Sequence, residues 1–385
     1  MVTNKEQNKQ NVPHLRFPEF HGEWEKHGLS EYLDFKNGLN PDSKRFGKGI
    51  KFISVMDILN NPVITYDCIR ASVQATDAEI SSFSVENGDI LFQRSSETLE
   101  DVGRANVYID DKVAVFGGFV IRGKKKANYN PLFFRYLLSS PYARKRIIPM
   151  GAGAQHFNIG QEGLSKVLLN FPSIEEQTKI ASLLHLLDER IATQSKLIEK
   201  LESLIKGLRV SLMQIENGNI VHLGEIAQIY QPQTISSTEL TEYGFLVYGA
   251  NGIIGKYKQY NHKTEQICIT CRGNTCGMVN YTKPMSWITG NAMVINTDEH
   301  QNKVCKRYLY HYLSAYNFNS IISGSGQPQI VRTPLEQLKV PLPTFLEQKQ
   351  KATFLDKIQG KIEISNKTLD LYLQQKQYLL RLMFI

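Results

Sequence analysis

The fold is decided by a long stretch in the middle of the chain, FPSIEEQTKIASLLHLLDERIATQSKLIEKLESLIKGLRVSL, at residues 171–212. Its apolar residues recur at alternating steps of four and three, the spacing of a heptad seam on one helix. The seam consists of Ile180, Leu184, Leu187, Ile191, Ile198, Leu201, Ile205, Leu208 and Leu212, with Gln194 as its one polar member. Ser173 and Glu176 form a Ser-x-x-Glu capping box at its start. We therefore predict a helix of about 40 residues, roughly 60 Å long.

The same arrangement returns near the C-terminus, 342 − 171 = 171 residues further on. Leu342-Pro343-Thr344 there matches Phe171-Pro172-Ser173, and Thr344 with Glu347 forms a second capping box. The matching seam positions are Lys351, Leu355, Ile358, Ile362, Ser365, Leu369, Tyr372, Lys376, Leu379 and Met383. The chain therefore contains an internal duplication with two long helices of similar length.

Two apolar seams of this length need a partner, and each can bury its residues against the other. An antiparallel pairing with full overlap places the central polar residues, Gln194 and Ser365, opposite each other at a pseudo-twofold centre. The alternative is that each of these residues faces solvent where the helices diverge. Lys351 and Lys376 replace apolar residues in the second seam, so this helix is also a candidate for docking a partner.

The stretch before each long helix repeats as well. Residues 90–94 resemble residues 267–272, which predicts equivalent strand-end positions for Arg94 and Arg272, before Gly103 and Gly277. The glycine-rich residues 151–155 resemble residues 324–327. Short alternating runs predict strands, one of them at residues 51–55, and we expect short helices at Pro131–Ser139 and Lys306–Ala315. We expect an α+β fold (mixed α/β) of two strand-rich globular domains joined by two long antiparallel coiled-coil helices with pseudo-twofold internal symmetry. The expected parts are an N-terminal extension at 1–24, domain 1 at 25–172, helix 1 at 173–217, domain 2 at 218–343 and helix 2 at 344–385.

The composition limits the class of protein. The 385 residues are 42% hydrophobic, and the formal net charge is +8, which makes polyanions such as DNA plausible partners. No apolar run approaches the roughly 20 residues that span a bilayer, and the polar N-terminus lacks the apolar core of a signal peptide. Five unevenly spaced cysteines do not form a disulfide framework. We expect a cytoplasmic protein with no membrane partner.

Signatures of catalysis and of cofactor binding are weak. The nearest glycine-rich turn, Phe46-Gly47-Lys48-Gly49, is followed by no helical pattern, and Gly255-Lys256 lacks the other residues of a P-loop. Asp110-Asp111-Lys112 contains the Asp-x-Lys of many nuclease sites, but a strand-to-turn role is the favoured interpretation.

The cysteines allow two interpretations. Cys268, Cys271, Cys276 and Cys305 have spacings that zinc also uses. However, Cys268 and Cys271 are an odd number of residues apart in a predicted strand, where they would face opposite sides. Buried strand thiols are therefore favoured over a zinc site, and we expect no metal.

Basic residues gather in two acid-poor stretches. From Lys112 to Gln161 the chain has nine Lys and Arg residues and no acid, and between Glu242 and Asp298 the only acid is Glu265. Such stretches are typical of phosphate binding, and amide or guanidinium groups on glycine-rich loops can bind base edges. The alternatives are a generic basic surface, loops that only connect elements, and buried salt bridges for the arginines. The candidate DNA-binding residues are Arg94, Lys124, Lys125, Lys126, Arg144, Lys145, Arg146, Gln155, His156, Asn158, Lys256, Lys258, Arg272, Asn274, Gln327, Gln329 and Arg332.

These features together resemble one known family. The doubled order of variable globular segment, glycine-rich loop, Pro, capping box and long helix resembles the DNA-specificity subunit of type I restriction-modification systems. The opening Pro13-His14-Leu15-Arg16-Phe17-Pro18-Glu19-Phe20, with Trp24-Glu25 after it, is similar to the start of such subunits from Gram-positive bacteria. The resemblance covers essentially the whole chain.

The resemblance implies a function in host defence without catalysis by this chain. Each globular segment would be a target recognition domain for one half of a bipartite double-stranded DNA site, and the helices would set the gap. Two methyltransferase subunits and two motor-nuclease subunits would dock, and these partners would bind S-adenosylmethionine, ATP and Mg²⁺, with no cofactor in this chain. The alternatives are a non-specific DNA-binding or coiled-coil assembly protein, and a stand-alone nuclease that uses Asp110 and Lys112.

Overall fold

The computed structural model describes residues 11–214, 219–324 and 326–385. The chain divides into unit 1, Met1–Gln194 with Thr368–Ile385, and unit 2, Ser195–Lys367. The division passes through both long helices, so each unit holds one globular part and a section of each helix. Residues 1–10 of the expected N-terminal extension and residues 215–218, at the expected boundary between helix 1 and domain 2, lie outside the described residues.

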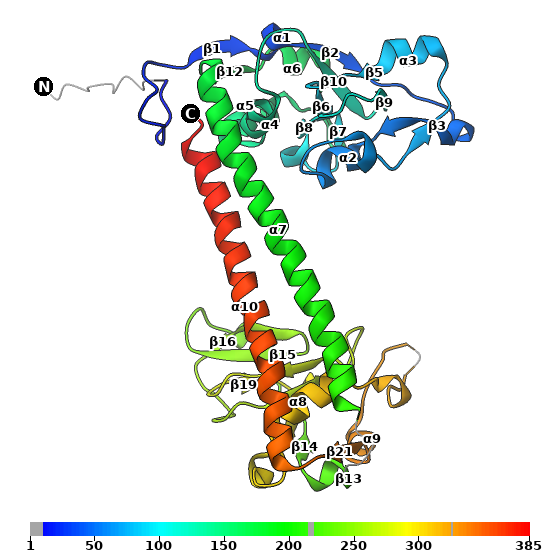
Figure 1. Cartoon of the computed structure of the whole chain (residues 1–385), viewed down its shortest axis with the longest axis vertical. Helices are drawn as coiled ribbons and strands as arrows, with labels where there is room; N and C mark the ends of the chain where they lie inside the picture. Colours follow the sequence, from blue (N-terminus) through cyan, green and yellow to red (C-terminus); the bar gives the residue numbers. More distant parts are fainter. Residues whose placement is uncertain (1–10, 215–218, 325) are drawn as a thin grey trace, which may run out of the picture. The chain divides into compact units, whose positions relative to one another are not determined.

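The globular part of unit 1 is built on two sheets (Figure 1). One has the strand order β2-β10-β6-β8 and the other β4-β3-β9-β5, and the pairs β1-β12 and β11-β7 complete the unit. The strands are β1 (Glu25–Gly28), β2 (Leu33–Asn37), β3 (Phe46–Ile53), β4 (Ser72–Val73), β5 (Ser84–Val85), β6 (Ile90–Gln93), β7 (Ser95–Ser96), β8 (Ala105–Val107), β9 (Ala114–Phe116), β10 (Val120–Lys125), β11 (Phe157–Asn158) and β12 (Leu168–Phe171). The helices are α1 (Leu29–Tyr32), α2 (Val55–Asn60), α3 (Asp77–Phe83), α4 (Pro131–Ser139), α5 (Pro141–Ile147) and α6 (Gln161–Ser165).

Unit 2 has the strand orders β14-β20-β17-β18, β16-β15-β19 and β13-β21. The strands are β13 (Asn219–His222), β14 (Gln228–Tyr230), β15 (Phe245–Gly249), β16 (Gly252–Tyr257), β17 (Ile267–Thr270), β18 (Val279–Tyr281), β19 (Trp287–Ile288), β20 (Ala292–Asn296) and β21 (Lys339–Leu342). The short helices are α8 (Lys306–Ala315) and α9 (Arg332–Glu336), and the long ones are α7 (Ile174–Met213) and α10 (Phe345–Leu382).

The two units repeat one topology, as the sequence duplication predicts. The sheet β2-β10-β6-β8 of unit 1 corresponds to β14-β20-β17-β18 of unit 2, and the antiparallel pair β1-β12 corresponds to β13-β21. Each unit also has one short parallel pair, β3 with β9 and β15 with β19. The expected α+β fold is confirmed.

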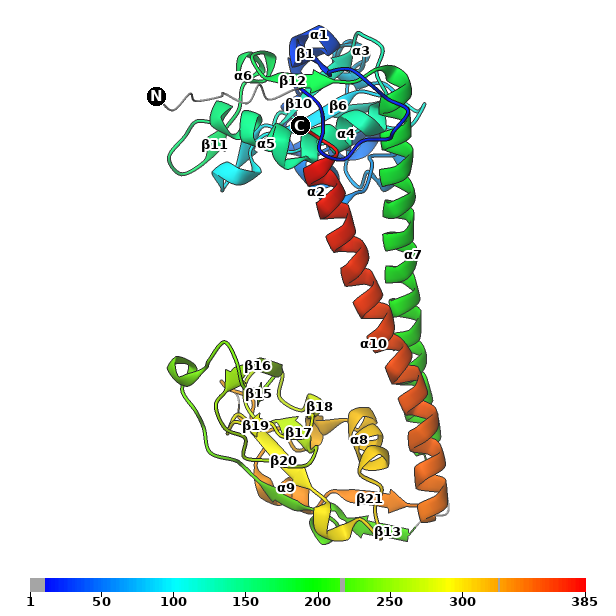
Figure 2. The same ribbon diagram turned by 90° about the vertical axis from the view of Figure 1, so that its left-hand side faces the viewer.

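One helix in each unit packs between the sheet and the long helices. In unit 1 this helix is α4, whose buried Phe133 and Leu137 share a core with Leu184 of α7 and Met383 of α10. In unit 2 it is α8, which lies beside α10 (Figure 2). The buried Tyr308 of α8 shares a core with residues of α7 and α10. Both short helices have the bounds that the sequence predicts.

The two long helices pair antiparallel within each unit. In unit 1, the Asp188 carboxylate on α7 lies 2.5 Å from Nζ of Lys376 on α10. In unit 2, Nζ of Lys351 donates to the carbonyl of Leu212 near the end of α7 (2.8 Å). Both lysines that interrupt the second seam therefore stabilise the helix pair, because each meets negative charge or a free carbonyl on the facing helix.

The pairing of the central polar residues of the two seams stays a prediction. Gln194 is the last residue of the first segment of unit 1, whereas Ser365 belongs to unit 2 and is buried. Their proximity at a pseudo-twofold centre remains to be tested.

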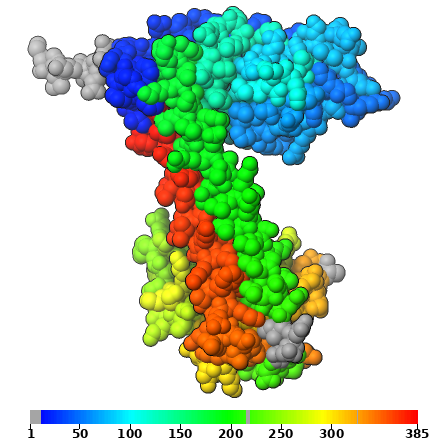
Figure 3. Space-filling model, in the orientation of Figure 1, coloured from blue at the N-terminus to red at the C-terminus, as the bar shows by residue number. Residues whose placement is uncertain are grey.

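The two capping boxes behave differently. At the second, the side chain of Glu347 accepts from the backbone N–H of Thr344 (2.9 Å), as the motif predicts. At the first, the backbone N–H of Glu176 still faces Ser173, but the carboxylate of Glu176 binds Arg16 (2.8 Å) and Nε1 of Trp24 (3.3 Å) instead. The N-terminal segment thereby docks on the start of α7 (Figure 3), and the expected reciprocal box is wrong on this one bond.

One strand begins and ends earlier than predicted, because β3 starts at Phe46. Residues 51–55 were expected to be extended, but β3 ends at Ile53 and α2 begins at Val55. The reason is local, because the backbone N–H and hydroxyl of Ser54 both donate to the carboxylate of Asp57 (2.7 and 2.8 Å), which caps α2.

A buried glutamine joins each globular part to its long helix. Gln177 donates to the carbonyl of Pro172 (3.1 Å) and accepts from the backbone N–H of Asn130, the N-cap of α4 (3.1 Å). Gln348 makes the equivalent bonds to Pro343 (3.0 Å) and to the N-cap of α8 (2.8 Å). The repeated Glu-Gln of the sequence therefore positions α4 and α8 against the helices.

Candidate nucleic-acid interface

The glycine-rich loops occupy matching places in the two units. In unit 1, Ala152 and Asn158 close a hairpin loop through two backbone hydrogen bonds of 2.9 and 2.8 Å. In unit 2, Ser323 and Gln329 close an equivalent loop with the same pair of bonds, 2.9 and 2.8 Å. The sequence match between the loops is therefore also a structural match.

One glycine in each loop fixes its shape. Gly153 has φ 145° and Gly324 has φ 92°, in the region that L side chains rarely adopt. A Cβ on Gly153 would lie 2.0 Å from the carbonyl oxygen of His156, and a Cβ on Gly324 would lie 2.4 Å from that of Gln327. His156 and Gln327 are thus equivalent positions in the two loops.

The side chains at the loop tips are exposed. Those of Gln155, His156 and Gln327 make no hydrogen bond to any residue within the described ranges. Asn158 is partly committed, because its Oδ1 accepts from Ser95 and its Nδ2 donates to the carbonyl of His156 (3.3 Å). The loop tips can therefore offer amide and imidazole groups to a base edge. The second N–H of the Asn158 side-chain amide is also available to donate.

The end of the central sheet lies beside each loop. Gly103 donates its N–H to the carbonyl of Gln93 at the end of β6 (3.0 Å), and Gly277 does the same to Thr270 at the end of β17 (2.9 Å). Both glycines have positive φ, 67° and 90°. Their predicted equivalence is confirmed.

The two arginines at this end are offset. Ile159 donates to the carbonyl of Arg94 (2.9 Å), and Ile330 donates to that of Cys271 (3.0 Å), so Arg94 corresponds to Cys271. Arg272 lies one residue further along, which reverses the side of the chain on which its side chain lies. The expectation that Arg94 and Arg272 hold equivalent positions is therefore wrong by one residue.

The environments of these arginines differ accordingly. Arg94 is partly buried and donates to the carbonyl of Gly118 (3.3 Å). Arg272 is exposed, and its backbone pairs with Gln329 of the loop. Asn274 is exposed two residues further on. Arg272 is therefore the better placed of the two arginines for a ligand of the loop.

The lysine triplet lies at the far end of the sheet from the loop. Val120 starts β10 opposite Gln93, whereas Lys124 and Lys125 end it opposite Asp34 and Leu33. At about 3.3 Å per residue, the two ends of β10 are roughly 17 Å apart. The structure does not bring the triplet and the loop together.

The three lysines also differ from one another. Lys124 pairs with Glu86 (2.7 Å), and Nζ of Lys125 donates to the carbonyl of Tyr129 (3.2 Å). Lys126 is exposed. Of the triplet, Lys126 is the most available for a phosphate.

The three basic residues of α5, Arg144, Lys145 and Arg146, differ in their contacts. The guanidinium of Arg144 donates to the carbonyls of Gly103 (3.0 Å) and Val102 (2.7 Å), and burial lowers the pKa of Arg144 to about 10. Arg144 therefore stabilises the turn after β6. Lys145 is exposed, and Arg146 is exposed but donates to the carbonyl of Tyr142 (2.9 Å).

In unit 2, the remaining candidates lie on two elements. Lys256 and Lys258 are exposed, Lys256 on β16 and Lys258 immediately after it. Arg332 opens α9 just after the loop, and its Nε pairs with Glu336 (2.7 Å). This ion pair on the surface of α9 makes the guanidinium of Arg332 less available to a ligand.

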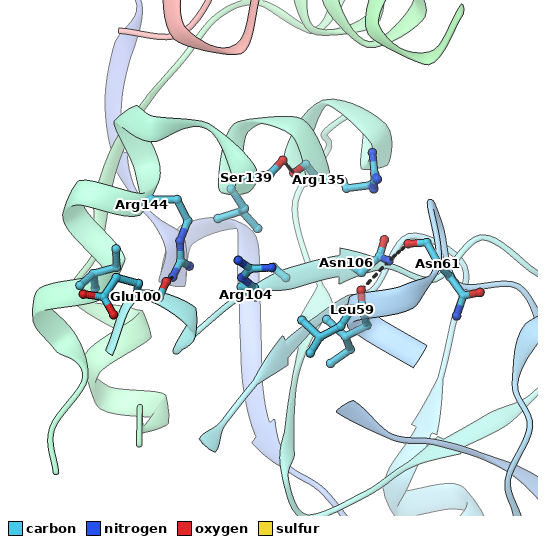
Figure 4. Close-up of a pocket in the computed structure, with 12 residues that line it drawn as sticks. Leu59, Asn61, Glu100, Arg104, Asn106, Arg135, Ser139 and Arg144 are labelled. Atoms are coloured by element: carbon cyan, nitrogen blue, oxygen red, sulfur yellow. Dashed lines mark hydrogen bonds between the residues drawn. The ribbon is translucent and has the colours of Figure 1, made fainter. Parts of the chain in front are cut away.

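A basic pocket of about 440 Å³ lies between α2, α4, α5 and β8 of unit 1 (Figure 4). Arg104, Arg135 and Arg144 line it. Each already has a partner, because Arg104 pairs with Asp101 (2.6 Å), Arg135 pairs with Asp188 (3.3 Å) and Arg144 binds backbone carbonyls. Compensated charge makes this pocket a weaker phosphate site than the loop surface.

Asp110, the candidate nuclease carboxylate, is bound to the backbone. Its Oδ2 accepts from the N–H of Tyr66 (2.8 Å) and its Oδ1 from that of Lys112 (3.0 Å). These backbone hydrogen bonds lower the pKa of Asp110. The geometry is that of a turn, as the favoured interpretation predicts.

Cys268 and Cys271 face different ways, whereas Cys276 packs against the same core as Cys271. Cys271 packs in one hydrophobic core with Ile269, whereas Cys268 packs in another with Val294. Burial raises the pKa of the Cys268 thiol. No group of three or more His, Cys, Asp or Glu residues suited to a metal is present in the described ranges.

An apolar surface beside the loop of unit 1 was missed by sequence reasoning. Phe46, Met56 and Phe119 line one pocket of about 410 Å³, and Phe119 is 69% exposed. The available signal was Phe119 after Gly117-Gly118, in a stretch without acids.

No helix in the described ranges has both the length and the apolar character of a bilayer-spanning segment. Two copies of one α+β domain, each with an exposed glycine-built loop near Lys and Arg, define a duplicated nucleic-acid-recognition protein. A family model described as type I restriction modification DNA specificity domain matches residues 21–203 and again residues 216–371. The chain therefore belongs to this family of DNA specificity subunits.

Individual relatives agree with this assignment. The EcoprrI specificity subunit of Escherichia coli is 32% identical over 140 residues, a match that spans 35% of this chain and only 34% of that protein. A putative specificity subunit of Methanocaldococcus jannaschii, MjaX, is 24% identical over 94% of this chain and 92% of the relative.

Solved structures share the fold. The S subunit of a type I restriction-modification system from M. genitalium matches with a TM-score of 0.66 at 18% identity, covering 97% of this chain and 99% of that one. A chain from a structural study of complex assembly in the type I system matches with a TM-score of 0.55 at 15% identity, covering 93% and 96%.

Proposed function

We propose that the globular domain of each unit recognises one half of a bipartite double-stranded DNA site. The observation that carries the proposal is the matched pair of exposed hairpin loops, residues 152–158 and 323–329. Each loop lies beside the end of the corresponding four-stranded sheet of its own unit. Their tips present amide and imidazole groups that can bind base edges, while neighbouring Lys and Arg bind phosphates. Different side chains on equivalent positions, such as His156 and Gln327, would give two different half-sites.

The long helices would set the gap between the half-sites and dock the other subunits. Two methyltransferase subunits would bind this chain, and two motor-nuclease subunits would complete the restriction complex. The antiparallel pairing within each unit supports a stiff spacer, since supercoiled helices resist bending more than a single helix does. A spacer of roughly 60 Å is long enough to separate two recognition domains by about one turn of B-DNA.

The chain itself would be non-catalytic. S-adenosylmethionine, ATP and Mg²⁺ would be bound by the partner subunits. The hydrogen bonds that commit both oxygens of Asp110 to the backbone argue against the alternative of a stand-alone nuclease. Incubating the purified chain with Mg²⁺ and plasmid tests this point, because cutting that is lost in Asp110→Ala would refute the proposal.

The recognition function is tested by mapping methylated adenines in the genome of cells with and without this chain. We expect one motif with two short specific parts separated by a fixed gap. A variant with Gln155 and His156 replaced by Ala should lose specificity in one part only. A matched variant with Gln327 replaced should lose it in the other. Loss in both parts from either variant, or methylation without sequence preference, would contradict the proposal.

A further inference from the structure

We propose that Phe119 of unit 1 contacts the C5-methyl group of a thymine in the half-site that this unit recognises. The inference rests on the proposed function and adds a specificity-determining residue and its base. It is carried by an exposed aromatic side chain on a rigid backbone, next to the loop and within a basic surface. Phe119 is 69% exposed, a fraction that is high for a Phe.

The backbone around Phe119 is held on every side. Gly117 donates to the carbonyl of Ile53 (3.0 Å), Val120 donates to that of Gly117 (2.8 Å), and Arg94 donates to that of Phe119 itself (2.9 Å). The exposure of Phe119 is therefore a property of a fixed turn. A contact made from such a position costs little ordering entropy.

The first of the two glycines before Phe119 packs closely against a buried ring. A Cβ on Gly117 would lie 2.5 Å from the ring of Phe52, and a Cβ on Gly118 would lie 1.7 Å from Oδ1 of Asn40. A side chain at Gly117 would have to displace the buried ring of Phe52, whereas at Gly118 only the end of the exposed Asn40 side chain would have to turn away. Close packing at Gly117 therefore fixes the start of the turn that carries Phe119.

The ring belongs to a larger apolar surface. Phe46, Met56 and Phe119 rim the pocket of about 410 Å³, and Leu39 and Phe52 form part of its lining. Phe46 is 42% and Met56 is 61% exposed. Exposed apolar side chains that gather around one pocket mark a binding surface.

The charge around this surface favours DNA as the occupant. Lys44 and Lys48 are exposed on either side of Phe46 in the sequence, and Arg94 lies beside Phe119, so cations outnumber the exposed carboxylate of the same segment, Asp42. Gly47 and Gly49 have positive φ (100° and 101°) and form a bulge in β3 that presents Lys48 to solvent. An apolar centre bordered by cations matches a base edge flanked by phosphates.

The thymine methyl is the one apolar group on the major-groove edge of B-DNA, and Phe is among the side chains that contact it. The equivalent position in unit 2 supports a role in base choice. The carbonyls of Phe119 and Asn291 accept the same sheet-end hydrogen bond, from Arg94 (2.9 Å) and from Cys271 (3.3 Å). Asn291 is exposed but polar, so the two units would select different bases here.

Deoxyuridine lacks only the methyl group of thymidine, which makes the test direct. The complex of this chain with its methyltransferase subunits is bound to a duplex carrying its methylation motif, and each thymine of the unit 1 half-site is replaced by deoxyuridine in turn. At one position we expect about fourfold weaker binding, the effect of one methyl-sized group. Phe119→Ala should bind the two duplexes equally, while Val113→Ala, at an exposed position just before β9, should retain the difference.

Each result decides the proposal. A half-site without thymine, or a Phe119→Ala complex that still distinguishes thymine from deoxyuridine, overturns it. Insensitivity to deoxyuridine with loss of affinity in Phe119→Ala also overturns it and indicates an intercalating wedge. Loss of methyltransferase copurification in Phe119→Ala, with DNA binding by the chain intact, would assign the surface to the partner protein. Absence of any specific DNA binding by the wild-type complex would instead refute the proposed function.

Discussion

Replacing Gln348 by Ala should uncouple α8 from the long helices and so weaken one recognition domain alone. Gln348 is 1% exposed. Its Oε1 accepts from the N–H of Cys305 (2.8 Å), and its Nε2 donates to the carbonyls of Pro343 (3.0 Å) and Lys303 (3.2 Å). The substitution leaves these groups without their partner.

The magnitude follows from the groups left unsatisfied. The N–H of Cys305 and the carbonyl of Pro343 lie at partly buried positions, and each unsatisfied group costs about 1.5 kcal/mol. We therefore expect a loss of about 3 kcal/mol in the local stability of unit 2, which corresponds to roughly a hundredfold more frequent opening of α8.

Amide hydrogen exchange measures this opening locally. Exchange within α8 should accelerate roughly a hundredfold in Gln348→Ala, while exchange within α4 stays unchanged. Gln177→Ala should give the mirror result, with α4 affected and α8 unchanged. Gln350→Ala, an exposed position on the same helix, should change neither by more than about twofold. Equal acceleration in α4 and α8, or none in either, would refute the reasoning.

Three further predictions concern the gap, the second half-site and pH. Removing one heptad from each long helix, residues 197–203 and 361–367, should shorten the preferred gap by about 10 Å or three base pairs, which sequencing of the methylated motif detects; an unchanged gap would contradict the spacer role. Arg272→Ala should weaken binding by about 5- to 150-fold if the guanidinium binds a base, whereas Arg332→Ala, whose side chain pairs with Glu336, should lose less in the same binding assay; equal losses would contradict this ranking. Burial lowers the pKa of His311 despite the nearby Asp356 carboxylate, with Arg209 and Arg307 also facing the ring. The unfolded state therefore binds a proton that the folded state resists, and stability should fall as pH drops through about 6.5. His311→Gln should show a smaller difference between unfolding midpoints at pH 7.5 and pH 5.5, and an identical difference would assign the effect to other groups.

Local sequence patterns were sufficient for the elements that depend on neighbours along the chain. The heptad spacing predicted both long helices, because four-three periodicity places apolar residues on one face wherever the helix lies. The sequence also predicted α4 and α8 with their observed bounds. The repeated Gly-rich loops and the Glu-Gln sequence revealed the duplication, since both halves use the same backbone geometry.

Contacts between distant segments were not predictable in this way. The carboxylate of Glu176 binds Arg16, 160 residues away, in place of its own capping box. Charge counting placed Arg144 with the DNA-binding residues, although its guanidinium binds carbonyls of the turn after β6. Sequence spacing could not show which cations are already neutralised inside the fold.

The sequence by itself determined the duplication, the two long helices and the basic character of the chain, because periodicity, capping and charge are properties of neighbouring residues. Only the tertiary structure decided which side chains remain available to a ligand. An offset of one residue between the ends of β6 and β17 separates the roles of Arg94 and Arg272, and the folded turn after β9 leaves Phe119 in solvent. Such outcomes depend on segments that meet only after folding.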